Sequence, residues 1–250
     1  MGGDVAVLTL GGTISMTGAS GVTPTLEADE LLEAVPQLRG GPSIVARSVV
    51  RLPGANLTFS DLANVASAIR EELARGSVGA VVVQGTDTID ETAFALELLL
   101  ADVDEPVVVT GAMRNPTLPG ADGPANLFAA VHCAASAQMV GLGVTVVMND
   151  TIHAAVRVQK RHASRPDAFS SSPHGPVGWF QEGSPVVIDR TRCRFARIDP
   201  VRSSARVPVL AATMEPDGET WRAVVGAGID GLVVQGMGVG HVPQLLAPIL

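Results

Sequence analysis

Tyrosine is absent from the sequence, and aromatic residues make up only 3% of its 250 positions. Only two cysteines occur, Cys133 and Cys193, which are too few for the disulfide framework of a small secreted protein. No Cys or His residues have the close spacing that is typical of a zinc site, so we expect no bound metal. We therefore predict that both cysteines are buried thiols or bystanders.

The sequence also lacks long apolar runs and an excess of basic residues. No run approaches the roughly 20 consecutive apolar residues that span a bilayer, so we expect no membrane segment. The opening MGGDVAVLTLGGT has neither a basic flank nor a cleavage site, which predicts a first buried strand and a cytoplasmic protein. Lys and Arg number 17 against 25 Asp and Glu, a net charge of −8. Nucleic acid is therefore not an expected partner, although RHASR at 161–165 is a local basic exception.

Apolar residues make up 46% of the sequence, enough for a substantial core, and their patterns alternate between strand and helix. Short Val-rich runs predict strands at 4–10, 43–50, 79–85, 106–112 and 143–150. Helical spacing predicts helices at 60–76, with Ser60 as the N-cap, at 91–101 and at 124–138. This alternation predicts an α/β fold, in which a mostly parallel sheet is flanked by helices on both faces.

The later part of the chain changes in character. Residues 151–160 alternate like an extended arm or hairpin, and the stretch 161–185, rich in Ser, Pro and Gly, is expected to be mostly loop. Periodic patterns then predict strands within 205–214 and 231–236, a short helix near 219–227 and the start of a further helix. We therefore expect a larger N-terminal α/β domain with the candidate site at 1–185, a linker at 186–205 and a smaller C-terminal α/β domain at 206–250.

Polar loops follow four of the predicted strands. These loops are GGTIS at 11–15, QGTDT at 84–88, TGAMRN at 110–115 and NDT at 149–151. In open α/β sheets, ligands bind at the carboxyl ends of the strands. We therefore expect hydroxyl, carboxylate and amide groups to collect along one edge of the sheet.

Thr13 follows two glycines directly after the first predicted strand. Glycines let a ligand approach the backbone closely and leave N–H groups available, so the Thr13 hydroxyl is a candidate nucleophile. The simpler interpretation is a Gly-Gly turn with a capping threonine, since such turns are common. Neither GxxxxGK nor GxGxxG is present here, which argues against a phosphate-binding loop.

A second candidate cluster combines Thr86 and Asp87 with Lys160. The Thr–Asp–Thr run could be only a capping box, with Thr88 or Asp90 as the cap of the following helix. Asp87 lies ahead of the position where a cap is needed, so its carboxylate is available for a ligand. Lys160 could be an ordinary surface lysine, or it could favour loss of the Thr86 proton if it lies beside that hydroxyl.

Taken together, these segments resemble the bacterial L-asparaginase family from about residue 4 to the end of the chain. The resemblance is carried by LTLGGTIS at 8–15, VVVQGTDTIDETAF at 81–94, PVVVTGAMRNP at 106–116, GADGPANLFAAV at 120–131 and VVMNDTIHAAVRVQK at 146–160. The second segment is similar, almost residue for residue, to the GTDT-x-x-ETA signature of that family. The order and spacing of the segments make the resemblance specific.

The resemblance implies hydrolysis of L-asparagine to L-aspartate and ammonia, without a metal or an organic cofactor. By this likeness, Thr13 attacks the side-chain amide carbon and forms an acyl-enzyme. Thr86 and Lys160 prepare a proton-transfer path, and Asp87 holds the α-amino group of the substrate. A base relay suits an alcohol nucleophile, and backbone N–H groups of the GTDT loop are candidate donors to the oxyanion.

The sequence departs from the family pattern at several positions. The family uses a tyrosine near the nucleophile, and this chain has none. Ala55 and Asn56 stand where the family has the Ser-Gln pair that holds the substrate, and the resemblance adds Ala112 as a further substrate contact. His241 occupies the place of an asparagine that reaches a neighbouring subunit. The sequence ends at Leu250, which suggests a C-terminal domain that is incomplete relative to the family.

Several alternatives stay open. The same chemistry on L-glutamine could serve an amidotransferase subunit, and the altered residues could mark a binding or regulatory protein that has lost activity. A dinucleotide-binding protein, suggested by the three glycines at 236, 238 and 240, lacks the full glycine spacing. The resemblance also implies a homotetramer arranged as a dimer of dimers. Sequence physics alone supports only a closed, symmetric oligomer.

Overall fold

The computed structural model describes residues 3–11, 16–17, 23–24, 35–198 and 205–250. The chain divides into two compact units, Met1–Pro200 and Val201–Leu250. This division falls inside the segment 186–205 for which the sequence suggests a linker.

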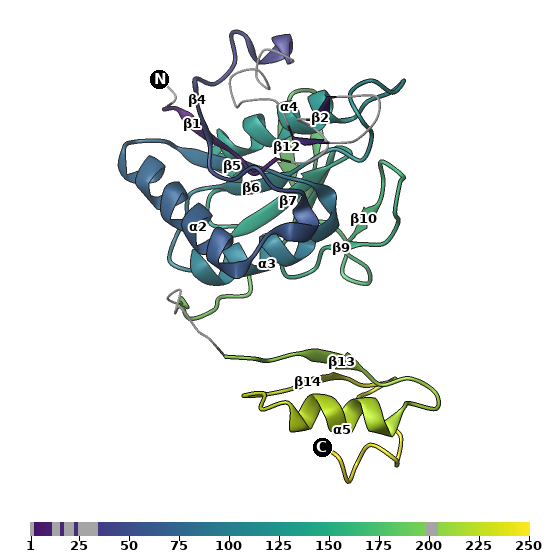
Figure 1. Ribbon diagram of the computed structural model, residues 1–250. Helices are drawn as coiled ribbons and strands as arrows, with labels where there is room; N and C mark the ends of the chain where they lie inside the picture. The colour runs from purple at the N-terminus through teal and green to yellow at the C-terminus, as the bar shows by residue number, and fades with distance from the viewer. Residues whose placement is uncertain (1–2, 12–15, 18–22, 25–34, 199–204) are drawn as a thin grey trace. The chain divides into compact units, whose positions relative to one another are not determined.

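The larger unit is built on an eight-stranded sheet (Figure 1), with strand order β12-β11-β8-β7-β6-β5-β1-β4. Its strands are β1 (Val5–Thr9), β4 (Ile44–Ser48), β5 (Gly79–Val83), β6 (Val107–Thr110), β7 (Val144–Met148), β8 (Thr151–Ala154), β11 (Gly178–Gln181) and β12 (Ser184–Val187). The run β4-β1-β5-β6-β7 is parallel, and β8, β11 and β12 continue it antiparallel. The predicted α/β fold with a mostly parallel sheet is confirmed.

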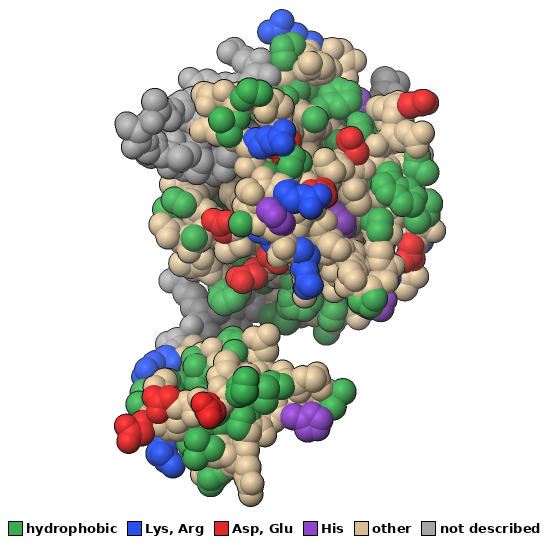
Figure 2. Space-filling view, turned by 90° about the vertical axis from the view of Figure 1, so that its right-hand side faces the viewer, with side chains coloured by type: hydrophobic (Ala, Val, Ile, Leu, Met, Phe, Trp, Pro, Cys, Tyr) green, Lys and Arg blue, Asp and Glu red, His purple; other side chains and the backbone are tan. Residues whose placement is uncertain are grey.

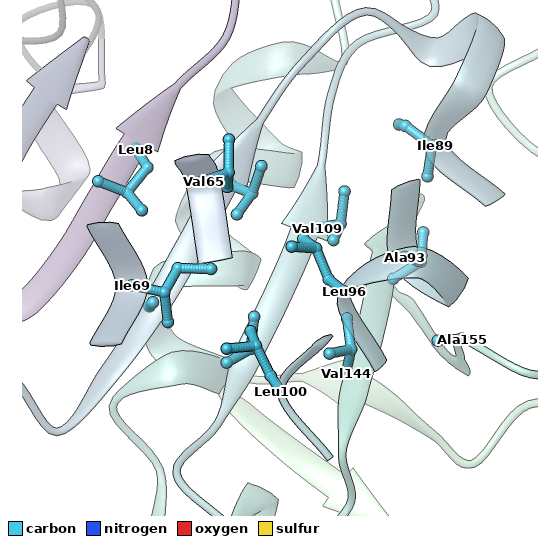
Figure 3. Close-up of a cluster of buried hydrophobic side chains, with 14 of the residues drawn as sticks. Leu8, Val65, Ile69, Ile89, Ala93, Leu96, Leu100, Val109, Val144 and Ala155 are labelled. Carbon is cyan, nitrogen blue, oxygen red and sulfur yellow. The ribbon is translucent and has the colours of Figure 1, made fainter. Parts of the chain in front are cut away.

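Helices cover both faces of this sheet. The helices α2 (Phe59–Ala74) and α3 (Ile89–Leu99) lie on one face, and α4 (Gly123–Ala134) lies on the other (Figure 1). The central strands are rich in Val and buried along their whole length, as expected for strands packed on both sides. On the α2–α3 face, the close-packed side chains include Leu8, Ile69, Leu96 and Val109 (Figure 3). The core therefore fixes the strand ends on which the site is built.

The order of the parallel strands changes direction at β1. β1 lies between β4 and β5, so the chain leaves β1 in one direction and later returns to pair on its other side. In doubly wound sheets this change of direction separates the loops that follow two neighbouring strands and leaves room for a ligand at their carboxyl ends. The relevant ends here are those of β1 and β5.

Short elements connect these parts. They are the single turns η2 (Pro36–Leu38), η3 (Gly54–Asn56), η4 (Thr86–Thr88) and η5 (Ala137–Met139), and the strand pairs β2 (Met16–Thr17) with β3 (Thr23–Pro24) and β9 (Gln159–Lys160) with β10 (Phe169–Ser170). The predicted hairpin character of 151–160 is confirmed, because β7 and β8 form a tight hairpin. Its two turn residues, Asn149 and Asp150, have φ values of 49° and 56°, which fit a two-residue turn with left-handed central residues.

One predicted detail is wrong and another is incomplete. Helix α2 is capped by Thr58 rather than Ser60, because Thr58 and Asp61 form a reciprocal capping box. The stretch 161–185 is mostly loop, as predicted, but it also contains β10, β11 and the start of β12, which were not predicted. Phe180 of β11 packs edge to face on Phe128 of α4. Strand β11 is therefore stabilised by contact with a helix that lies far away in the sequence.

The smaller unit contains β13 (Val209–Ala211), α5 (Gly218–Gly226) and β14 (Val233–Gln235), with the two strands parallel. Asp217 caps α5 by accepting hydrogen bonds from two backbone N–H groups. Trp221 and Leu246 lie at the centre of its apolar cluster. The further helix that was predicted after residue 236 is wrong, because turns follow β14. No helix in the described part of the chain is both long and apolar enough to span a bilayer.

Candidate functional site

The end of β1 is held directly beside the end of β5. The Leu10 N–H donates to the Val83 carbonyl oxygen at 2.8 Å, and the Leu52 N–H donates to the Leu10 carbonyl oxygen at 3.0 Å. Gly11 follows with a φ of 94°, a conformation that favours glycine, so the chain turns sharply at the carboxyl edge of the sheet. The predicted nucleophile Thr13 lies outside the described residues.

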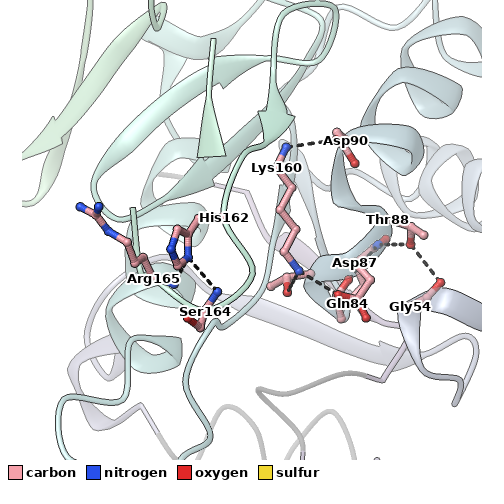
Figure 4. Close-up of polar contacts among 11 residues, drawn as sticks. Gly54, Gln84, Asp87, Thr88, Asp90, Lys160, His162, Ser164 and Arg165 are labelled. Atoms are coloured by element: carbon pink, nitrogen blue, oxygen red, sulfur yellow. Dashed lines mark hydrogen bonds and ion pairs between the residues drawn. The ribbon is translucent and has the colours of Figure 1, made fainter. Parts of the chain in front are cut away.

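The loop after β5 brings three predicted residues together. The Lys160 ammonium nitrogen Nζ donates to Thr86 Oγ1 at 2.9 Å and to Asp87 Oδ1 at 2.8 Å. Thr86 and Asp87 belong to the single turn η4, whereas Lys160 extends from strand β9 (Figure 4). The structure therefore brings the Thr–Asp–Lys set into one contact group.

Exposure differs sharply across this group. The side chain of Lys160 is 15% exposed and that of Asp87 is 69% exposed, while Thr86 is only 7% exposed. The Thr86 hydroxyl is thus shielded beneath the ion pair, and the Asp87 carboxylate faces solvent. An exposed carboxylate with several acceptor positions can bind a cationic group of a ligand while it remains paired with Lys160.

Lys160 is the single lysine of the sequence, and the other 16 of the 17 Lys and Arg residues are arginines. Arginine keeps its proton under all ordinary conditions, whereas a lysine amine can lose and regain one. A basic side chain needed only for charge could be arginine here as it is elsewhere in the chain. The one lysine amine of the sequence therefore lies beside the Thr86 hydroxyl and the Asp87 carboxylate.

The turn η3 lies against η4 and carries the predicted substrate contacts Ala55 and Asn56, which are both exposed. Thr88 occupies the N-cap position of α3, but its hydroxyl donates to the Gly54 carbonyl oxygen at 3.0 Å and makes no capping hydrogen bond, so this loop is not a capping box. A Cβ atom added at Gly54 would lie 2.8 Å from the Gly85 carbonyl oxygen. The two turns can approach this closely because residue 54 is glycine.

The side-chain amide of Gln84 stabilises the contact between the turns η3 and η4. Its amide nitrogen Nε2 donates to Thr88 Oγ1 at 3.3 Å and to the Gly85 carbonyl oxygen at 3.2 Å, and its side chain is fully buried (Figure 4). The Thr88 hydroxyl in turn donates to the Gly54 carbonyl oxygen. In the sequence Gln84 stands out only as part of the QGTDT motif, which does not predict this supporting role.

Ala112, the remaining predicted substrate contact, is only 1% exposed as a whole residue and lies in the apolar cluster that includes residues of α4. Its loop is held by Asp122, which accepts hydrogen bonds from the Met113 and Arg114 N–H groups at 3.0 and 2.8 Å. Asn126 donates to the Gly111 carbonyl oxygen at 2.9 Å. The GADGPANLF motif was the signal for these supporting residues, although their role was not predicted.

The loop 161–168 that follows Lys160 carries mixed charge. Arg165 forms a two-point ion pair with Asp167, with N–O distances of 2.8 and 2.6 Å. The His162 nitrogen Nδ1 accepts backbone N–H groups from Ser164 and Arg165 (Figure 4). Figure 2 shows basic, acidic and histidine side chains close together on this side of the unit. The basic motif is therefore folded onto itself rather than arranged as a continuous basic surface.

Two other predictions concern the second unit and metals. His241 is exposed in a turn after β14, paired through the backbone with Met237. The dinucleotide-binding alternative is wrong, because β14 leads into turns and not into the helix N-terminus that holds phosphates. Among the described residues, no group of three or more His, Cys, Asp or Glu side chains has the geometry of a metal site.

Comparisons with known proteins identify the family of the chain. The family model described as "Asparaginase, N-terminal" matches residues 4–192. A probable periplasmic L-asparaginase of Haemophilus influenzae is 32% identical over 250 residues, covering 96% of this chain and 71% of that protein. The crystal structure of a probable cytoplasmic L-asparaginase from Campylobacter jejuni aligns with a TM-score of 0.89 at 31% identity, covering 98% of this chain and 78% of that one.

A relative with a different description also matches. One of the subunits of the glutamyl-tRNA(Gln) amidotransferase of Methanococcus maripaludis is 31% identical over 264 residues, covering 96% of this chain and 61% of that protein. The family model covers well over half of the chain, and the relatives match nearly its full length. The chain therefore belongs to the asparaginase family.

Proposed function

We propose that the protein is an amidohydrolase that converts L-asparagine to L-aspartate and ammonia, with L-glutamine as a secondary substrate. The observation that carries this proposal is the contact of the Lys160 ammonium with the Thr86 hydroxyl and the Asp87 carboxylate. This group lies at the carboxyl edge of β5, next to the turn that leads from β1 toward Thr13. Thr13 and the proton-transfer groups thus belong to loops that follow neighbouring parallel strands, where ligands bind in open α/β sheets.

The proposed reaction has two stages. The Thr13 oxygen attacks the side-chain amide carbon, and a C–O bond forms as the C–N bond breaks and ammonia leaves with an added proton. Water then attacks the acyl-enzyme, releasing L-aspartate and returning the proton to Thr13. The protein must remove one proton from an alcohol and deliver one to a leaving amine, which general acid–base groups can do.

Thr86 and Lys160 suit this task. Thr86 Oγ1 accepts a hydrogen bond from Lys160, so its own hydroxyl hydrogen can point to the substrate or to a water molecule. The low exposure of Thr86 keeps this path away from bulk solvent. A proton can therefore pass between the reacting group and the lysine amine through one buried hydroxyl.

Asp87 is proposed to hold the substrate through its α-amino group. Its exposed carboxylate pairs with Lys160 through Oδ1 and can accept a second cation at the same time. Ala55 and Asn56 on η3, and Ala112 in the loop after β6, are proposed to complete the substrate site. The Thr88–Gly54 hydrogen bond joins η3 to η4 and so connects Ala55 and Asn56 to the turn that carries Asp87.

An ammonia assay across several amides tests this proposal. The parent protein should release ammonia and L-aspartate in equal amounts from L-asparagine, and Thr13→Ala should reduce kcat by a factor of about 10² or more. A parent protein that binds L-asparagine without releasing ammonia would support the binding or regulatory alternative. Substrate protection of Lys160 against acylation would locate the ligand independently of turnover, since that lysine is the only one.

A second candidate function is that of a glutaminase-type amidotransferase subunit, because several relatives bear the name of an amidotransferase subunit. In that case, ammonia release from L-glutamine should depend on a partner protein and an acceptor. Assays of both amides with the chain alone distinguish the two functions. Efficient partner-free hydrolysis of L-asparagine favours the first.

The cellular and quaternary context is also part of the proposal. A cytoplasmic location agrees with the description of the Campylobacter structure, although the Haemophilus relative is described as periplasmic. A homotetramer, arranged as a dimer of dimers, is the proposed assembly. Light scattering of the purified protein tests it. Two domains joined by a linker within 186–205 are the proposed organisation.

A further inference from the structure

Asp90 connects the lysine strand to the helix that follows the site. It lies in the first turn of α3, three residues after Asp87, and its carboxylate oxygen Oδ2 accepts the backbone N–H of Lys160 at 3.1 Å. The other oxygen, Oδ1, accepts the N–H of Glu91 at the start of the same helix. One side chain therefore binds the backbone of Lys160 while the Lys160 ammonium binds Thr86 and Asp87 (Figure 4).

The position of this bond follows from the geometry of the β9–β10 pair. The N–H of Arg161 donates to the Ala168 carbonyl oxygen, within the hairpin. Successive N–H groups of a strand point to opposite sides, so the Lys160 N–H points away from β10. Asp90 satisfies that outward group. Its negative charge is also favourable near the amino end of α3.

These contacts form a closed ring. It runs from Thr86 and Asp87 through the Lys160 side chain to the Lys160 backbone, then to Asp90 and back along the chain to the turn η4. A lysine has a long flexible stem, so a contact at the ammonium alone leaves the backbone free to shift. Because both the backbone and the ammonium of Lys160 are bound, the distance that its side chain must span is fixed.

We propose that Asp90 is a positioning residue that holds the Lys160 backbone at the distance from which its ammonium reaches the Thr86 hydroxyl. This inference rests on the proposed function, because it takes Lys160 as a proton-transfer group. Asp90 acts through Lys160 and does not itself need to touch the substrate. The required group is therefore an acceptor oxygen, and its charge is secondary.

Two variants of Asp90 distinguish the role of its acceptor oxygen from the role of its negative charge. Asp90→Ala removes the acceptor, and kcat for L-asparagine should fall about 10- to 100-fold, as expected for a catalytic group displaced by about 1 Å. The KM should change much less. Asp90→Asn keeps an oxygen that can accept the Lys160 N–H, so its kcat should stay within about threefold of the parent. Thermal unfolding midpoints of both variants establish that they are folded.

Acylation of Lys160 gives a readout that does not depend on turnover. Acetic anhydride modifies amines, and peptide mass spectrometry compares Lys160 with the N-terminal amine of the same molecule as an internal reference. Loss of the backbone anchor should raise the relative acylation of Lys160 severalfold in Asp90→Ala and leave it unchanged in Asp90→Asn. A general loosening of the fold would affect both variants alike.

The outcomes distinguish this inference from the proposed function. If Lys160→Met abolishes turnover while Asp90→Ala keeps parental kcat and acylation, the inference is wrong and the role of Lys160 stands. If Asp90→Asn is as impaired as Asp90→Ala, charge rather than the hydrogen bond matters, and the inference is again wrong. Parental turnover in Lys160→Met overturns the lysine role and this inference with it.

Discussion

The ammonium nitrogen of Lys160 lies 2.9 Å from the hydroxyl oxygen of Thr86, although 74 residues separate the two in the sequence. The hydroxyl is supplied by the turn after a central parallel strand, and the amine by a short hairpin beyond the last parallel strand. Neither element alone could bring an amine to a buried hydroxyl. The proposed chemistry therefore depends on the packing of the whole sheet edge.

Removal of the Thr86 hydroxyl should affect turnover much more than removal of its neighbour. Thr86→Val keeps the shape of the side chain and deletes the proton path, so kcat should fall by about 10² or more. Thr88→Val removes the hydrogen bonds to the Gly54 carbonyl and from Gln84 Nε2, which contribute about 1 kcal/mol each to stability, so kcat should stay within about fivefold of the parent. Steady-state kinetics with L-asparagine compares them, and equal losses would argue against a specific role for Thr86.

A methyl group at residue 54 should separate the turns η3 and η4. Gly54→Ala would place its Cβ 2.8 Å from the Gly85 carbonyl oxygen, a backbone atom that cannot move alone. We expect the KM for L-asparagine to rise about 10-fold and the free energy of unfolding to fall by about 1–3 kcal/mol. Gly226→Ala is the control, since a Cβ there meets no atom within 4 Å. An unchanged KM in Gly54→Ala would remove Ala55 and Asn56 from the proposed substrate site.

The buried ion pair between Arg192 and Glu97 should be important for stability. Their side chains are 6% and 4% exposed, and the Glu97 carboxylate also accepts the Val144 N–H at 2.6 Å. Arg192→Met leaves a buried carboxylate without its cation, so the free energy of unfolding should fall by about 3–5 kcal/mol. Urea unfolding measures this loss. The more exposed Arg190 is the matched control, and Arg190→Met should cost less than about 1 kcal/mol.

His153 should make stability depend on pH. Its ring nitrogen Nδ1 lies 2.8 Å from the Ser171 hydroxyl, and burial lowers its pKa from 6.5 to about 4. Between these values the unfolded chain binds a proton that the folded protein excludes, so the free energy of unfolding falls as the pH drops from 6.5 toward 4. The full loss is about 3 kcal/mol.

Comparison with His153→Gln isolates this contribution from the acid titration of carboxylates. Urea unfolding at several pH values should show a weaker decline below pH 6.5 in the variant than in the parent. Parallel curves for the two proteins would show that His153 is not the group responsible.

The sequence predicted those elements whose structure depends mainly on their own residues. Strands such as β5 and β7 were predictable because a Val-rich run packed on both faces has no polar alternation, and the motif loops followed from their ends. Strand β11 was missed because GWFQ is too short and mixed to show a period. Its position depends on Phe180 packing against α4.

The candidate site was predictable as a set of residues but not as a geometry. Thr86 and Asp87 follow one strand, so their proximity to each other was certain, whereas the approach of Lys160 depends on the hairpin β9–β10. The hydrogen bond from the Lys160 backbone to Asp90 joins residues that are 70 positions apart, and no periodic pattern in the sequence indicates it. Asp90 was considered only as a helix cap for that reason.

The rate of ammonia release from L-asparagine by Lys160 variants tests the central claim most directly. Lys160→Met and Lys160→Arg should both lower kcat by a factor of about 10² to 10⁴, because neither supplies an amine that can exchange a proton. Arg161→Met, one residue along the same strand end, is the control and should stay close to the parent. Parental turnover in Lys160→Arg would show that only positive charge is needed and would contradict the proposed proton path.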